Sequence, residues 1–152
     1  MPLNEDSDSK PTVKVRDFEP YVVKGIVLEY YEGGNLFEIV HNVQWTAWKG
    51  IMDEAMEKLE VLDNTEVLNR DASPHNFLVF RDSQEEIQVL TIDFDSCELR
   101  ESKEKDAQWG PAKCMYDEEG VIIHHMGKEF EKHNYEWSYV KRDKYTKYEV
   151  YV

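Results

Sequence analysis

Four residues with carboxylate or amide side chains lie at the ends of two short apolar runs, and together they could bind a divalent cation. The apolar runs, Phe77 to Phe80 and Val89 to Ile92, are separated by a polar stretch and predict an antiparallel hairpin. A hairpin brings the start of its first strand beside the end of its second. Oxygen ligands and carboxylate repulsion there favour a hard cation such as Mg²⁺. The predicted metal site combines Asn76, Asp93 and Asp95, with Asp71 beside them.

Asp71 and His75 are the residues in this region with the best chemistry for catalysis. A carboxylate can serve as a general base, and the imidazole close to it in the same loop can also accept or donate a proton. The alternative for Asp71 is structural, because an aspartate in a loop often accepts hydrogen bonds from nearby backbone N–H groups. Both interpretations remain open at the level of sequence.

The same residues resemble two motifs of the protein-kinase-like superfamily. Residues 70–76 read R-D-A-S-P-H-N, which is similar to the R-D-x-x-x-x-N catalytic loop. Residues 92–95 read I-D-F-D, which looks like the metal-binding motif of that superfamily. Because Ser73 and Asp95 stand where protein kinases have Lys and Gly, the sequence looks closer to aminoglycoside and choline phosphotransferases and to divergent fungal kinase-like proteins.

The resemblance covers residues 26–98, about half of the chain, and it is incomplete. Residues 26–36 are similar to the last strand of a kinase small lobe running into the hinge, but the sequence has no Gly-rich loop before them. Asn69 stands where the family has His. The resemblance implies that Asp71 orients or deprotonates an attacking hydroxyl, while Asn76 and the residue after Ile92 hold Mg²⁺.

Phosphoryl transfer depends almost wholly on positioning and charge stabilisation, so the missing phosphate-binding lobe argues against an autonomous ATP-dependent kinase. Three interpretations remain. The first is a pseudokinase-like module whose acidic site binds a small molecule or a protein partner. The second is an enzyme that uses Asp71 as general base in chemistry other than phosphoryl transfer. The third is one half of a phosphotransferase that a partner chain completes.

The predicted fold is α+β, with a kinase C-lobe-like core made of one long helix and the catalytic-loop hairpin. Residues 45–62 carry apolar side chains at the three-and-four spacing of one buried helical face. Residues 1–11 predict a flexible acidic tail, and residues 12–152 predict a single truncated kinase-like domain, divergent from residue 99 onward. This divergent part is expected to be β-rich.

Shorter elements are also predicted from local composition. Before the long helix, we expect strands at 21–23 and 26–28, a turn at Gly33 and Gly34, and a short helix at 35–40. After the acidic motif, we expect a loop at 96–110, a hairpin formed by 112–116 and 121–125, and a terminal strand at 145–152.

Charge and cysteine content restrict the partners and the compartment. The sequence has 32 acidic and 18 basic residues and a net charge of -14, so phosphates of nucleic acid or of an anionic membrane would be repelled. Cys97 and Cys114 lie apart and predict free thiols, which together with the lack of a long apolar run predicts a cytoplasmic protein. Aromatic residues in the C-terminal third suit a pocket wall or a protein interface, including that of a homodimer.

Overall fold

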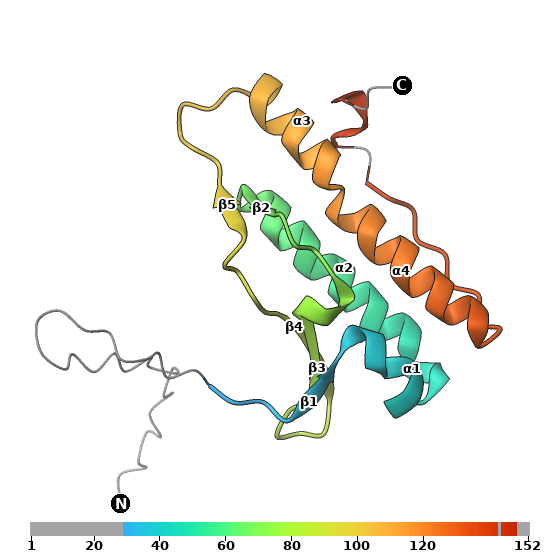
Figure 1. Ribbon diagram of the computed structural model, residues 1–152. Coiled ribbons are helices and arrows are strands. Elements are labelled where there is room, and N and C mark those ends of the chain that lie inside the picture. Colours follow the sequence, from blue (N-terminus) through green and yellow to red (C-terminus); the bar gives the residue numbers. More distant parts are fainter. Residues whose placement is uncertain (1–28, 143, 149–152) are drawn as a thin grey trace, which may run out of the picture. The chain divides into compact units, whose positions relative to one another are not determined.

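The computed structural model describes residues 29–142 and 144–148, and Glu32–Val152 form one compact unit. This unit mixes helices and strands, which confirms the α+β class (Figure 1). The predicted tail and the strands predicted at 21–23 and 26–28 lie outside the described residues. The elements are β1 Gly33–Asn35, α1 Ile39–Asn42, α2 Trp48–Asn64, β2 Val67–Asn69, β3 Phe77–Arg81, β4 Ile87–Thr91, β5 Cys97–Leu99, α3 Asp106–Tyr116 and α4 Glu118–Lys132, with short 3₁₀ turns η1 to η4 between or after them.

The hairpin predicted around the acidic loop is confirmed as β3 and β4. The two strands pair antiparallel with Leu78 opposite Leu90, and the Asp82 carboxylate accepts hydrogen bonds from backbone N–H groups in the turn that joins them. β1 pairs with the other edge of β3, so the sheet order is β1-β3-β4. The turn predicted at Gly33 and Gly34 is wrong, because these residues are extended in β1. A Cβ atom at Gly33 would lie 2.3 Å from the Val79 carbonyl oxygen, so only glycine permits this close pairing.

The long helix is confirmed as α2, preceded by the 3₁₀ turn η2, Trp45–Ala47. The apolar residues of α2 form one buried face, in which Met52 and Met56 are almost completely buried. This face packs against β4 and β2, and α4 also contacts the helix. Trp45 was predicted to share the buried face, but its side chain is 65% exposed. The reason is that the 3₁₀ turn breaks the helical phase before Trp48, whose indole N–H donates to the Val43 carbonyl at 3.0 Å.

A second, two-stranded sheet joins β2 to β5 and was not predicted. Its strands are antiparallel, and Asn69 lies opposite Cys97. The loop predicted at residues 96–110 is therefore wrong at both ends, because it contains β5 and the beginning of α3. Three-residue strands carry too short a pattern to be recognised locally, and this pair forms only when the segments on either side of the hairpin meet.

Within the described residues the C-terminal segment is not β-rich, since residues 106–132 form the helices α3 and α4. Asp117 joins the two helices with a left-handed backbone (φ 39°), and its carboxylate accepts a hydrogen bond from the Gly120 N–H at 3.1 Å. The acidic D-E-E-G sequence is thus a helix start and not a β-turn. Ile122, Met126 and Phe130 are spaced by four and join the core formed by α2.

The end of the described chain also differs from its prediction. Thr146–Tyr148 is the 3₁₀ turn η4 where a terminal strand was expected, and residues 149–152 lie outside the described part. The ring of Tyr148 lies against Gly110 of α3, where a Cβ atom would be 2.1 Å from the ring. Among the described helices, none is both long and apolar enough to cross a membrane.

Candidate functional site

The predicted catalytic loop connects β2 to β3 and is shaped by local hydrogen bonds. Ser73 begins the 3₁₀ turn η3, Pro74–Asn76, and its hydroxyl oxygen accepts from the His75 N–H at 3.3 Å. Pro74 occupies the first position of the turn, where a missing N–H has no consequence. The turn ends at Asn76, immediately before the first residue of β3. A local sequence signal therefore sets the position of this side chain.

Asn76 is hydrogen-bonded to Asp71, another predicted site residue of the same loop. Its amide nitrogen donates to the Asp71 carbonyl oxygen at 2.8 Å and to the Asp71 carboxylate at 3.2 Å. Asn76 is 9% exposed, whereas Asp71 lies at the surface. In the described part of the chain, the carboxylate is therefore held by a side chain and not by a backbone N–H of its own loop. This arrangement keeps the exposed Asp71 carboxylate next to Asn76.

The segment after β4 approaches the same loop. The N–H of Ile92 donates to the Asn76 carbonyl at 2.9 Å, and the N–H of Arg70 donates to the Ser96 carbonyl at 3.4 Å. Between these two connections, Asp93 has a left-handed backbone with φ 62°. That conformation is uncommon for a non-glycine residue. The carboxylates of Asp93 and Asp95 are exposed, and Asp95 accepts a hydrogen bond from the Ser96 hydroxyl at 3.1 Å.

An open depression of about 610 Å³ lies beside these two segments. Asp71 and Asp95 both contribute to it, together with Cys97, so the structure brings two of the predicted carboxylates to one surface. The pKa of the Cys97 thiol is raised by burial and, to a lesser extent, by the negative charges of Glu118, Asp95 and Asp93. The full lining is Arg70, Asp71, Asp95, Ser96, Cys97, Glu98 and Tyr116.

His75 packs against an aromatic ring and, like Asn76 and Asp93, is absent from the lining of the depression. Its ring stacks on Phe37, with the centroids 5.3 Å apart and the planes at 8°, and it does not line the depression beside Asp71. A stacked, exposed imidazole covers an apolar ring and leaves no contact with the Asp71 carboxylate among the described interactions. The pairing of Asp71 with His75 therefore has no geometric support.

The oxygen atoms near the depression are of the type that Mg²⁺ prefers, namely carboxylate and amide oxygens. Within the described residues, however, no group of three or more His, Cys, Asp or Glu side chains is arranged around a metal position. Asn76 is not in that class of residues, and the exposed carboxylates of Asp93 and Asp95 have room to move. The donor set fits a hard cation in chemistry, but it is not closed around one.

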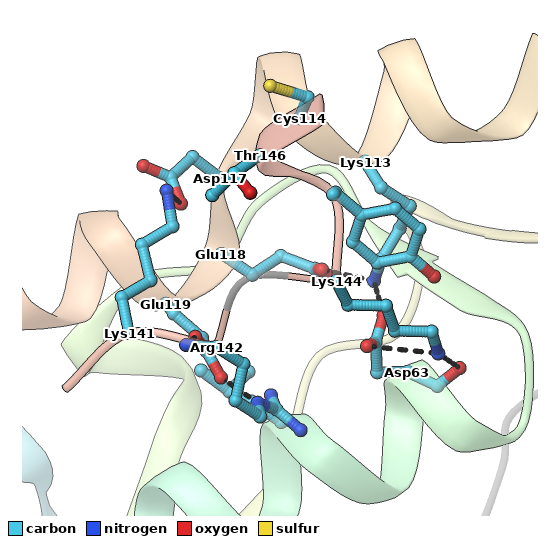
Figure 2. A pocket seen from close by; sticks show the side chains of 12 residues that line it. Asp63, Lys113, Cys114, Asp117, Glu118, Glu119, Lys141, Arg142, Lys144 and Thr146 are labelled. Carbon is cyan, nitrogen blue, oxygen red and sulfur yellow. Dashed lines mark hydrogen bonds and ion pairs between the residues drawn. The ribbon is translucent and has the colours of Figure 1, made fainter. Parts of the chain in front are cut away.

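A buried cluster of charged side chains anchors the strand that leads into the loop, and it was not predicted from the sequence. Lys113 lies between Asp63, at 3.0 Å, and Glu118, and all three side chains are at least nine-tenths buried (Figure 2). Glu118 also accepts the backbone N–H of Asn69 at 2.6 Å, immediately before the catalytic loop. Burial raises the pKa of Glu118 despite the Lys113 ammonium and the Asn69 N–H, which favour its charged form.

The C-terminal segment covers this cluster with further charges. Arg142 pairs with Glu119, Lys144 with Asp63 at 3.3 Å, and Lys141 with Asp117 at 2.7 Å (Figure 2). The cavity enclosed beneath them is only about 40 Å³, enough for a water molecule but not for a substrate. The cluster therefore belongs to the framework of the fold.

No protein-family model matches the chain, and neither does any curated protein. The geometry of Asp71, Asn76, Asp93 and Asp95, with their partners in the fold, is therefore the basis for assigning a function.

Proposed function

We propose that the chain is a kinase-like, pseudokinase-type module that binds a divalent cation together with a small polar molecule at the acidic site, and that it is not an ATP phosphotransferase on its own. The observation that carries this proposal is the double hydrogen bond from the Asn76 amide to Asp71. It supports a site in which Asn76 holds the Asp71 carboxylate at the edge of an open depression.

The pairing of the two strands supports the same proposal. Because Ile92 N–H donates to the Asn76 carbonyl, the residue that follows Ile92 begins next to Asn76. In the proposed site, Asn76, Asp93 and Asp95 hold the cation, and Asp71 faces the bound molecule. When Mg²⁺ is bound, it supplies positive charge that neutralises anionic groups of the ligand. The protein residues orient the cation and keep the Asp71 carboxylate next to it.

The absence of a Gly-rich loop from the sequence limits what the site is proposed to do. Without backbone N–H groups and a lysine around the phosphates, transition-state charge on a transferred phosphoryl group has little protein to stabilise it. Binding requires fewer fixed groups than transfer does. The acidic site is consequently proposed to bind a ligand. Turnover of a substrate without a transferable phosphate would instead favour Asp71 as the general base of another reaction.

Binding of Mn²⁺ tests the proposal directly. It is measured by electron paramagnetic resonance, in which the signal of the unbound ion decreases as the ion binds. We expect the wild type to bind one Mn²⁺ ion, and we expect Mg²⁺ to compete for it. Asp93→Asn and Asp95→Asn should each weaken binding by about tenfold or more, because each removes one anionic ligand while keeping the shape of the side chain.

Asp53→Asn is the matched control, since it makes the same change on the surface of α2, where Asp53 pairs with the exposed Lys49. Its Mn²⁺ affinity should equal that of the wild type. If the wild type binds no Mn²⁺ at millimolar concentration, or if all three variants bind it equally, the proposed cation site is wrong.

A further inference from the structure

We infer that Asn69, fixed in place by Glu118 and Lys113, is a positioning residue that holds Asp71 for the ligand of the acidic site. This inference rests on the function proposed above and assigns a role to residues of the C-terminal helices, which lie outside the kinase-like stretch. Asn69 touches Asp71 and does not reach the depression itself, so it acts through Asp71.

The hydrogen bonds of Asn69 connect the protein interior to the exposed carboxylate. Its side-chain oxygen accepts the backbone N–H of Asp71 at 2.9 Å, and its own backbone N–H donates to Glu118 at 2.6 Å. Asn69 is 1% exposed. A surface residue such as Asp71 thus takes its backbone position from a completely buried neighbour, while Asn76 holds the carbonyl group on the other side.

Glu118 and Lys113 restrain the strand from which Asn69 projects. Lys113 donates to the Val67 carbonyl at 3.0 Å, two residues before Asn69, and pairs with Glu118, which accepts from Asn69 itself. Both groups of this ion pair are therefore used to hold β2. Because they come from the junction of α3 and α4, the start of the loop is anchored from a distant part of the chain.

The side-chain amide nitrogen of Asn69 adds nothing to the stability of the fold. This nitrogen is buried without a hydrogen-bond partner among the described residues, which is an unfavourable state for a polar atom. The amide oxygen, in contrast, is used by the Asp71 N–H. Of the two polar atoms of the Asn69 side chain, it is therefore the oxygen, through its contact with Asp71, that makes a hydrogen bond.

Amide hydrogen exchange and Mn²⁺ affinity test the inference on the full chain. In the wild type, we expect the Asp71 N–H to exchange about tenfold more slowly, or slower still, than in an unstructured chain, although Asp71 is exposed. Asn69→Ala removes the acceptor, so exchange at Asp71 should become roughly three- to tenfold faster, and Mn²⁺ affinity should fall by a similar factor. Asn69→Ser retains a neutral acceptor oxygen that can accept an N–H two residues later, so it should protect the Asp71 N–H better than Asn69→Ala does. The exposed Asn64→Ala is the matched control and should change neither measurement.

The outcomes separate this inference from the proposed function. If the wild type binds no Mn²⁺, the proposed cation site fails, and exchange at Asp71 still decides whether Asn69 positions it. If the wild type binds Mn²⁺ and Asn69→Ala binds it equally well, the inference is overturned, whatever the variant does to the melting temperature. Should Asn69→Ala not fold, the wild type alone decides, because an unprotected Asp71 N–H contradicts the contact on which the inference depends.

Discussion

Replacing Lys113 with methionine is expected to be among the most destabilising single changes in the protein. Methionine fills a similar volume but removes the ammonium that lies 3.0 Å from Asp63 and also pairs with Glu118. The side chain of Lys113 is 2% exposed, so bulk solvent does not screen the charges that it neutralises. Two carboxylates that share one cation would lose it, and the Val67 carbonyl would lose its donor.

The magnitude follows from which groups remain paired. Removing one member of a buried ion pair costs about 3–5 kcal/mol, because the partner charge is left uncompensated. Asp63 retains Lys144 at 3.3 Å, so the principal loss falls on Glu118. A compact unit of this size is stable by roughly 6–18 kcal/mol, and each kcal/mol corresponds to about 4 °C in melting temperature. We therefore expect Lys113→Met to lower the melting temperature by about 12–20 °C.

A double-mutant cycle in urea denaturation isolates the pair. Glu118→Gln keeps an oxygen for the Asn69 N–H but carries no charge, so Lys113→Met should cost only about 1–2 kcal/mol in that background. Lys49→Met removes an exposed lysine paired with Asp53 and should change stability little. The electrostatic reasoning is refuted if Lys113→Met costs less than about 1 kcal/mol, or if its cost is the same in the wild-type background and in the Glu118→Gln background.

Three further predictions concern activity, packing and pH. The purified chain should neither hydrolyse ATP nor transfer its γ-phosphate with Mg²⁺ or Mn²⁺, and a radiolabel assay showing turnover that Asp71→Asn abolishes would contradict this. Met52→Asp and Met56→Asp, which bury an unpaired charge, should each destabilise the fold by at least about 3 kcal/mol in thermal denaturation, whereas Val61→Asp on the exposed side of the same helix should be tolerated; equal melting temperatures for all three would rule out the buried-face assignment. The pKa of Glu118 is raised above its usual 4.5 in the folded state, so its contribution to stability is complete below that pH and is lost as the pH rises through the raised value. In urea titrations from about pH 4 to 7, the free energy of unfolding should therefore depend less on pH for Glu118→Gln than for the wild type. Parallel pH profiles would show that Glu118 is not the cause.

Local sequence patterns were enough to predict the long helix and the hairpin. The three-and-four spacing after Trp48 identified α2, since an apolar stripe of that period can be buried only on a helix. The two β-type runs separated by a polar turn identified the hairpin, and the hairpin in turn predicted that Asn76 and the residues after Ile92 would be neighbours. Asp71 was predicted beside Asn76 for the same reason, and its hydrogen bonds with Asn76 agree with this part of the site.

Other features were misread because the local pattern was compatible with more than one structure. Gly33 and Gly34 are typical of a turn, yet the close approach of β3 uses the missing side chain of Gly33 to build a strand. The D-E-E-G sequence at residues 117–120 is compatible with a hairpin turn, but Asp117 adopts a left-handed conformation and starts α4. In the second case, the burial of Ile122 and Met126 against the core decided between two locally acceptable conformations.

Which charges are buried, and which groups they hold, depends on contacts between segments that are distant in the sequence. Lys113 and Glu118 are five residues apart in an acidic, polar stretch, and no pattern in that stretch distinguishes them from the surface charges around them. They become buried because α3 and α4 pack beside α2, which brings Asp63 and Asn69 to them from about fifty residues away. A charged side chain is stable in the interior only when such partners meet it, and that meeting is a property of the folded chain. The buried residues that hold the backbone of Asp71 could therefore not be predicted from the sequence, although Asp71 itself could.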